Sequence, residues 1–250
     1  MELATLKKDV WGREVILGAS WDLLWVILAL TFIGIAVHAI VVATKKRKAA
    51  PDSSGKRIER HEKIDRIFHW VMAVSMIILL ITGIFPKIGI EFAWLTIHWV
   101  AGLLLTVIII FHIFRSIFWQ NLKDMWIGLN DLKEPFDESY KPGKYSLAQK
   151  SLHASVTILT LLVIISGIIM FALIDTPWWE RTNALSEDML GWVFLTHGLV
   201  SLALVAIISL HIYFGLRPEK LFYTRSMIKG WISEHEKNEN HDQEKWVSKN

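Results

Sequence analysis

The sequence predicts an all-α, polytopic membrane protein in which a four-helix core follows one extra N-terminal transmembrane helix. Hydrophobic residues make up 53% of the 250 residues and charged residues 20%, which is below the roughly 25% of ordinary soluble domains. Five apolar stretches come close to or exceed the length of about 20 residues that a helix needs to cross a bilayer. They are Trp21–Ala43, Ile67–Phe85, Phe92–Phe118, Leu152–Ile174 and Met189–Leu216.

The first apolar stretch predicts a membrane anchor and not a cleaved signal peptide. In a signal peptide, positive charge precedes the apolar run and a small-residue cleavage site follows it. Here the order is reversed, because the run is followed by Lys45, Lys46, Arg47 and Lys48 and by no such cleavage site.

Positive charge is distributed unevenly between the two sides of the predicted helices. Nine Lys and Arg residues lie in the 45–66 loop, six in the 115–150 loop and seven after Leu216, so one side holds 22 of the 27. The positive-inside rule places that side in the cytoplasm. We therefore expect a bacterial inner-membrane protein with a periplasmic N-terminus and a cytoplasmic C-terminus. Tryptophans mark the expected outer ends: Trp21, Trp94, Trp178, Trp179 and Trp192.

Composition changes divide the chain into four parts. We expect an N-terminal anchor over 1–48, a cytoplasmic linker over 49–63, a four-helix core over 64–232 and a polar cytoplasmic tail over 233–250.

Cysteine is absent from the chain. Its absence excludes disulfides, zinc–thiolate sites, iron–sulfur clusters held by this chain and covalent c-type haem attachment. A formal net charge of +3 gives no indication of nucleic-acid binding.

The four core helices contain an internal repeat. Residues 14 positions apart share one face of a helix and lie about 21 Å apart along its axis. The repeated pairs with this spacing are His69 and Gly83, His98 and His112, His153 and Gly167, and His197 and His211.

Histidines in membrane helices are costly and usually face a cofactor, a cavity or a partner. Histidines at two depths on facing helices suit two stacked b-type haems, each with two axial imidazoles. Zinc is disfavoured because no cysteine or third carboxylate ligand is at hand. A proton-coupled transporter and a non-redox membrane anchor remain as alternatives. Small residues would let a macrocycle approach the backbone or would serve close helix packing: Gly83, Gly102, Gly167, Gly198 and Ser201.

Four further histidines lie outside this pattern. His38 is expected at the membrane interface, with a quinone contact as the alternative. His61, His235 and His241 lie in polar segments and are expected at the surface.

Five short motifs are distributed over the core. They are KIDRIFHW at Lys63–Trp70, IHWVAG at Ile97–Gly102, GKYSLAQK at Gly143–Lys150, THG at Thr196–Gly198 and LHIYFG at Leu210–Gly215. Over roughly Ile64–Trp231 the chain thereby resembles the cytochrome b (gamma) subunit of membrane-bound respiratory formate dehydrogenase. Related subunits serve thiosulfate reductases and nickel–iron hydrogenases.

The resemblance implies a dihaem cytochrome b bundle and assigns its axial ligands. His98 and His197 would hold the outer haem, and His69 and His211 the inner one. Spacing alone would instead pair His112 with His211.

His112 and His153 are then left near the inner face, for quinone protonation, contact with haem propionates or a third haem. Arg66 and Arg115 are candidate propionate partners or interfacial anchors.

The resemblance also implies a menaquinone or ubiquinone beside the inner haem, with Gln149 and Ser146 in its pocket. The family has Asn where this chain has Ser146, whose hydroxyl can still hydrogen-bond a quinone carbonyl.

By resemblance, the chain would carry electrons between a periplasmic iron–sulfur and catalytic partner and the quinone pool. Substrate catalysis would then belong to another chain. The extra first helix would take the place of a helix that the iron–sulfur subunit contributes in the family's formate dehydrogenase complex.

Overall fold

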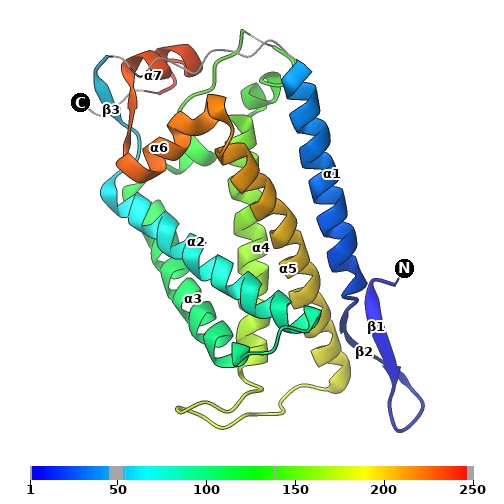
Figure 1. The fold of residues 1–250 in the computed structure, drawn as a ribbon. Coiled ribbons are helices and arrows are strands. Elements are labelled where there is room, and N and C mark those ends of the chain that lie inside the picture. The colour runs from blue at the N-terminus through cyan, green and yellow to red at the C-terminus, as the bar shows by residue number, and fades with distance from the viewer. Residues whose placement is uncertain (1, 45–52, 54, 138, 247–250) are drawn as a thin grey trace. The chain divides into compact units, whose positions relative to one another are not determined.

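The computed structural model describes residues 2–44, 53, 55–137 and 139–246 (Figure 1). Five helices in it are long and apolar enough to cross a membrane, which confirms the predicted fold class. They are α1 (Asp22–Thr44), α2 (Lys63–Ile84), α3 (Trp94–Trp119), α4 (Leu147–Phe171) and α5 (Glu187–Gly215). The predicted basic cluster at 45–48, positions 49–52 and 54 of the predicted 49–63 linker and the last four tail residues lie outside the described residues.

Helices α2 and α4 begin four and five residues before the apolar stretches that predict them, because their polar first turns are also helical. At α4, the Ser146 hydroxyl accepts from the Gln149 backbone N–H at 3.3 Å, and Gln149 Oε1 accepts from the Ser146 N–H at 3.0 Å. This reciprocal capping box satisfies two backbone donors that the helix itself cannot. A hydropathy pattern does not detect such a cap, so it predicts that the helix starts later than it does.

A short β-hairpin precedes α1. Strands β1 (Ala4–Lys8) and β2 (Glu14–Ala19) pair antiparallel. In the connecting turn, the Asp9 carboxylate accepts from the backbone N–H groups of Trp11 and Arg13, each at 2.8 Å. A Cβ added at Gly198 of α5 would lie 2.7 Å from the Ala19 Cβ. Glycine at that position therefore lets the end of the hairpin pack directly on the helix.

The linker and the tail form a second small sheet. Strand β3 (Arg57–Glu59) pairs with β4 (Trp231–Ser233), with Ile58 opposite Ile232. Helix α6 (Leu221–Lys229) precedes β4 and α7 (Glu234–Asn240) follows it. Gly230 links α6 to β4 at φ 92°, a left-handed conformation that favours glycine. Four short 3₁₀ segments complete the described elements: η1 (Phe85–Ile88), η2 (Leu122–Met125), η3 (Leu129–Lys133) and η4 (Pro218–Lys220).

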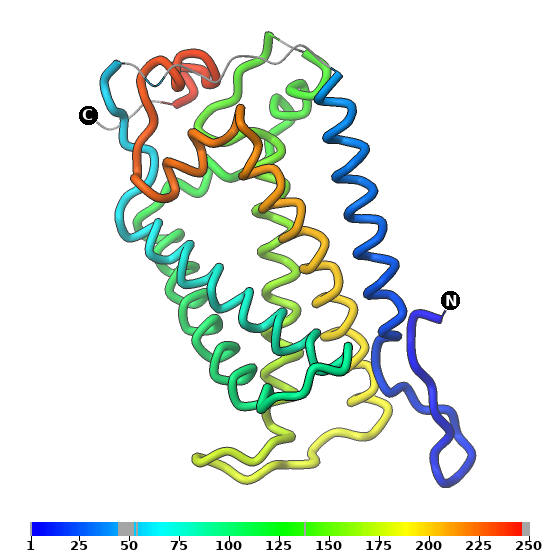
Figure 2. Tube along the Cα trace, in the orientation of Figure 1, coloured from blue at the N-terminus to red at the C-terminus, as the bar shows by residue number. Residues whose placement is uncertain are grey.

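The chain divides into two compact units, and each of the five long helices contributes to both (Figure 2). The first unit comprises Met1–Val37, Ser75–Thr106 and Val156–Ser209. The second comprises His38–Val74, Val107–Ser155 and Leu210–Asn250.

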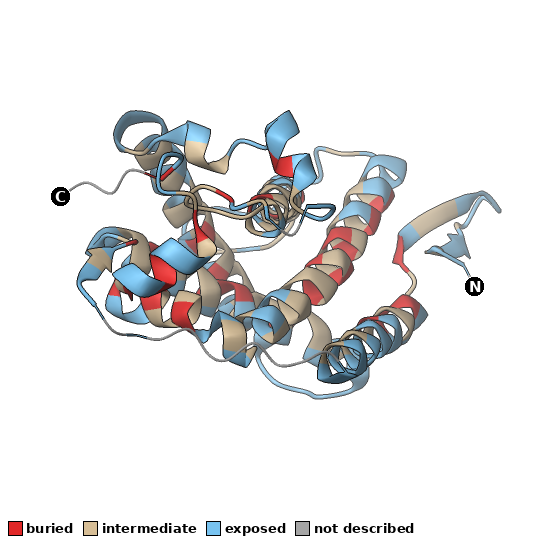
Figure 3. Ribbon diagram, turned by 90° about the horizontal axis from the view of Figure 1, so that it is seen from above, coloured by how far each residue is buried: buried red, intermediate tan, exposed pale blue. Residues whose placement is uncertain are grey.

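Each unit has its own buried apolar cluster, and Figure 3 colours buried residues red. In the first unit, Leu23 and Leu24 pack against Leu202. In the second, Phe222, Ile232 and Trp246 pack together. Helix α1 buries Leu23, Leu24 and Thr31. Most of its other apolar side chains are exposed.

Candidate functional site

Six histidines of the core helices meet as three pairs. One pair, between α3 and α5, lies in the first unit; the other two, between α2 and α5 and between α3 and α4, lie in the second. The ring centres lie 6.3, 6.2 and 6.3 Å apart, and the ring planes are inclined by 64°, 66° and 62°. In that order the pairs are His98 with His197, His69 with His211, and His112 with His153.

The separation of the rings distinguishes a metal-binding pair from a hydrogen-bonded one. An N–H···N hydrogen bond of about 2.9 Å would bring two imidazole centres to roughly 5 Å. A metal ion bound at about 2.0 Å by each ring holds the centres roughly 6.3 Å apart. Among the described residues, no hydrogen bond joins the two rings of any pair. All three pairs therefore have the spacing of axial ligands on opposite sides of one metal.

A hydroxyl group fixes the His98 ring. Thr82 of α2 donates its one hydroxyl hydrogen to the Ile78 carbonyl at 2.7 Å, so it acts as acceptor in its 2.8 Å contact with His98 Nδ1. His98 is then protonated at Nδ1, and Nε2 keeps a free lone pair for a metal. A hydrogen bond to the remote ring nitrogen is the usual way in which a protein orients a ligating imidazole.

Ser166 of α4 does the same for His197. It donates to the Leu162 carbonyl at 2.8 Å and accepts from His197 Nδ1 at 3.0 Å. Thr82 and Ser166 are both buried, and each directly precedes a glycine.

These two glycines give the histidine rings room. A Cβ at Gly83 would lie 3.6 Å from Cε1 of His98, and one at Gly167 would lie 3.4 Å from Cε1 of His197. The sequence reasoning had identified the glycines and missed the hydroxyls beside them. The repeated dipeptides Thr82–Gly83 and Ser166–Gly167 could have identified the two hydroxyl groups from the sequence.

In the second unit, His69 lies beside His211. This is the pairing that the resemblance implies, whereas spacing alone favours His112 as the neighbour of His211. His69 also contacts Trp70 edge-to-face, with ring centres 5.4 Å apart. Among the described residues, no hydrogen bond reaches the ring nitrogens of either histidine.

Arg66 and Arg115, the two candidate propionate partners, both bond to other residues of this chain. Arg115 pairs with Asp65 and with Glu62, each at 2.8 Å. Arg66 donates from Nη1 to the Ile228 carbonyl of α6 at 2.6 Å. Arg66 also lines a pocket of about 370 Å³, whose other lining residues are Lys63, Ile67, Trp70, Val71 and Ile228.

Ser146 and Gln149 form the cap of α4, which was not anticipated from their place in the GKYSLAQK motif. The cap uses only Oε1 of Gln149. Among the described residues, nothing accepts from its Nε2 group, which leaves an amide donor for a ligand. Burial in the same segment lowers the pKa of Lys144 and raises the pKa of Tyr145 to about 12.

His241 is the most important residue that the sequence reasoning missed. It is only 1% exposed, so the expectation of a surface position was wrong, whereas His235 is exposed as expected. His241 donates from Nδ1 to the Gly143 carbonyl at 2.6 Å. Its Nε2 accepts from Arg60 Nη1 and from the Tyr223 hydroxyl, each at 3.1 Å.

This arrangement holds His241 neutral and attaches the tail to the motif. Burial, reinforced by the nearby Arg60 charge, lowers the pKa of His241 to about 3. Arg60 also donates to the Lys144 carbonyl at 2.7 Å, and the Asp242 N–H donates to the Pro142 carbonyl at 2.9 Å. The His241 imidazole therefore joins three segments: the linker through Arg60, the GKYSLAQK motif through Gly143, and the C-terminal tail.

The chain is similar to two cytochrome subunits of known enzymes. It is 25% identical over 195 residues to the formate dehydrogenase cytochrome b556(fdo) subunit of Escherichia coli (strain K12), covering 70% of this chain and 86% of that protein. It is 25% identical over 204 residues to the formate dehydrogenase cytochrome b556 subunit of Haemophilus influenzae, covering 72% of this chain and 79% of that protein. The resemblance drawn from the motifs is thereby confirmed.

Residues 60–230 match the family model of prokaryotic cytochrome b561. The match spans α2 to α5 and includes all three histidine pairs. A cytochrome b binds haem b, and the spacing of the paired imidazoles fits two nitrogen ligands on one iron. The chain is therefore a membrane cytochrome b and belongs to the prokaryotic cytochrome b561 family.

Proposed function

We propose that this chain is the quinone-reactive, dihaem membrane subunit of a respiratory oxidoreductase. It carries electrons between a periplasmic iron–sulfur and catalytic partner and quinone on the cytoplasmic side. The observation that carries the proposal is the metal-ligand spacing of His98 with His197 and of His69 with His211. The names of the two relatives as formate dehydrogenase subunits support it.

In this proposal the two histidine pairs hold two b-type haems, one in each unit. Bis-imidazole ligation supplies one-electron carriers without an open coordination position, so they transfer electrons and do not bind oxygen. Thr82 and Ser166 orient the imidazoles of the first unit, and Gly83 and Gly167 give them room.

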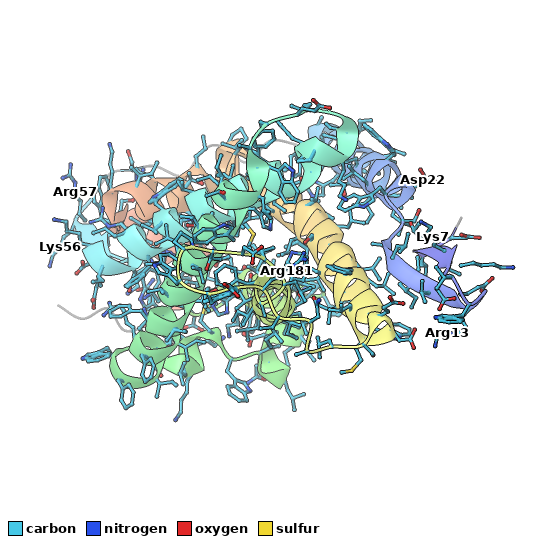
Figure 4. The ribbon with its side chains drawn as sticks, turned by 90° about the horizontal axis from the view of Figure 1, so that it is seen from below. Lys7, Arg13, Asp22, Lys56, Arg57 and Arg181 are labelled. Carbon is cyan, nitrogen blue, oxygen red and sulfur yellow. The ribbon has the colours of Figure 1, made fainter. Side chains whose placement is uncertain are left out.

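Charge supports a periplasmic first unit and a cytoplasmic second unit. The residue ranges of the first unit hold five of the 27 Lys and Arg residues, and those of the second hold 22. Figure 4 labels Lys7, Arg13 and Arg181 from the first group and Lys56 and Arg57 from the second. In this proposal the β1–β2 hairpin lies outside the membrane and the α6–α7 tail lies inside.

Exposed aromatic side chains mark where the periplasmic partner would dock. Trp11 at the tip of the hairpin and Trp178 in the 172–186 loop are 81% and 69% exposed. The outward-facing apolar side chains of α1 suit lipid or a partner's transmembrane helix.

Quinone binding is assigned to the start of α4. Gln149 Nε2 would donate to a carbonyl of a menaquinone or ubiquinone, and the Ser146 hydroxyl lies in the same capping box. Reduction of a quinone consumes two electrons and two protons, so a site beside the cytoplasmic unit would take those protons from the cytoplasm.

The purified chain tests the proposal directly. We expect at least two haem b per polypeptide, measured by pyridine haemochrome against quantitative amino-acid analysis, and reduction of the haem by a quinol. A folded protein without haem would contradict the electron-transfer function and favour a transporter or a non-redox anchor.

Replacing Gln149 with glutamate separates quinone binding from the cap. Glutamate keeps the acceptor oxygen that a capping box needs and removes the amide donor. We expect quinol oxidation to fall by about tenfold, the effect of roughly 1.4 kcal/mol that one lost hydrogen bond can have, with haem content unchanged. Ser146→Ala removes the capping hydroxyl and keeps the Gln149 amide, so we expect a smaller loss there than in Gln149→Glu. Quinol kinetics equal to wild type in Gln149→Glu would rule out this role.

Replacing Thr82 with valine tests the orientation of His98. The hydroxyl accepts from Nδ1–H and so makes the imidazole a stronger electron donor, which favours ferric iron. We expect Thr82→Val to retain haem and to raise the reduction potential of one component in a redox titration. Thr106→Val is the control, because the hydroxyl of Thr106 donates to the Gly102 carbonyl of its own helix and, among the described residues, to no histidine. A potential that shifts equally in both variants, or in neither, contradicts the role.

A further inference from the structure

We propose that His112 and His153 are the axial ligands of a third haem b. The inference goes beyond the dihaem function proposed above and rests on it in one respect, that this chain binds haem through paired histidines. It assigns a site in the second unit, between α3 and α4, to the two core histidines that the dihaem function leaves without a metal.

The geometry of the pair matches that of the other two. The ring centres of His112 and His153 lie 6.3 Å apart with planes inclined by 62°, compared with 6.2 Å and 66° for His69 and His211. No hydrogen bond joins the two rings in the described part of the chain, and a distance of 6.3 Å is too long for one. Quinone protonation or propionate contact by two separate histidines would not require this spacing, whereas coordination of one iron does.

The internal repeat relates this pair to another. His69, Thr82 and Gly83 of α2 recur 84 residues later in α4, and His98 and His112 of α3 recur 99 residues later in α5. The later copies are His153, Ser166, Gly167, His197 and His211. Exchanging the two halves turns the pair of His69 and His211 into the pair of His153 and His112. A ligand pair in one half of the repeat therefore has its counterpart in the other.

The number of ligands selects haem over a bare metal ion. A structural zinc site takes four protein ligands and a catalytic site three. Among the described residues, no group of three or more His, Cys, Asp or Glu side chains is placed to hold a metal. Two imidazoles suffice only where the cofactor supplies the remaining nitrogens, as the macrocycle of a haem does.

The surroundings of the pair suit electron transfer. Phe68 and Phe111, which directly precede His69 and His112, stack with ring centres 4.7 Å apart and planes inclined by 23°. This contact fixes α2 and α3 together at the level of both ligand pairs of the second unit.

Gln149 lies four residues before His153 and hence on the same face of α4. A quinol held at Gln149 would release two electrons and two protons, and two one-electron centres in this unit could each accept one electron.

Haem stoichiometry and a conservative variant test the proposal. We expect three haem b per wild-type chain and two in His112→Leu and His153→Leu, with a redox titration that loses one component. His38→Leu is the matched control and should keep all three, because His38 bonds to Tyr213 and Arg217 and lies outside the three pairs described above. His112→Met should retain the third haem with a raised potential, since a thioether can ligate haem iron; a purely structural histidine would produce no such shift.

The outcomes separate this inference from the function that it extends. Two haems in the wild type, unchanged in His112→Leu and reduced to one in His197→Ala, would overturn the third site and leave the dihaem function intact. A folded chain without any haem would overturn both. If the leucine variants fail to fold, the wild-type count and the His112→Met titration decide the matter.

Discussion

Replacing His197 with alanine is expected to remove one haem completely and to leave the remaining haem spectrum intact. In the proposed site the two rings of the first-unit pair, whose centres lie 6.3 Å apart, hold one iron from opposite sides, and alanine removes one of its two protein ligands. The other histidine pairs are in the second unit, and within the described part of the chain they do not share the hydrogen-bond partners Thr82 and Ser166. Pyridine haemochrome should therefore show a decrease of one haem per chain.

The double variant makes the test sharper. Because the proposed site has His98 and His197 on the same iron, His98→Ala with His197→Ala should lose no more haem than either single change, a non-additive result typical of residues in one site. Ser201→Ala is the control on the same helix, because it removes only a hydrogen bond to the His197 backbone carbonyl. Loss of two haems, or of none, would argue against the assignment of this pair.

Replacing His241 with alanine is expected to release the C-terminal tail. The change deprives the buried Arg60 guanidinium, which is 3% exposed, of an acceptor and leaves the Tyr223 hydroxyl and the Gly143 carbonyl without their partner. Stranded buried polar groups cost about 1–3 kcal/mol each, and more where a charge is involved. We expect rapid proteolysis of residues after 230, with full haem content. His235→Ala, an exposed histidine on α7, should change neither.

Acid should have the same effect on the wild type. The unfolded tail protonates His241 near its ordinary pKa of 6.5, whereas the folded site holds that pKa at about 3. The unfolded state therefore binds more protons between these values, so the stabilisation is complete above pH 6.5 and is lost as the pH falls towards 3. Hydrogen exchange of the tail at pH 7 and pH 5 should show this loss in the wild type and a smaller one in His241→Ala. Equal pH dependence in both would contradict the role of His241.

The sequence predicted the helices well because membrane spanning depends on a local property, the length of an apolar run. It placed the start of α4 at Leu152 instead of Leu147, since the capping box of Ser146 and Gln149 makes a polar turn helical. The β1–β2 hairpin had no comparable signal, because its turn depends on hydrogen bonds to the Asp9 side chain.

The candidate site was predictable in its residue types and not in its contacts. Histidine spacing found all six members of the three pairs, but it favoured His112 and not His69 as the neighbour of His211. Which ring faces which depends on the rotation of each helix, and two histidines near the same end of neighbouring helices are equivalent by spacing alone. The buried position of His241 could not be predicted for another reason. Its partners Arg60 and Gly143 are 181 and 98 residues away in the chain.

The three histidine pairs have the symmetry of contacts in a homodimer. In a two-fold symmetric dimer, residue i of one subunit contacts residue j of the other and j contacts i, while a residue on the axis meets its own copy. His98 meets its repeat counterpart His197, and the other two pairs are related by exchange of the halves. Duplication and fusion of a two-helix chain that worked as a homodimer would leave this pattern. In the proposed function, fusion would also let the two exchangeable pairs diverge, so that they could differ in reduction potential.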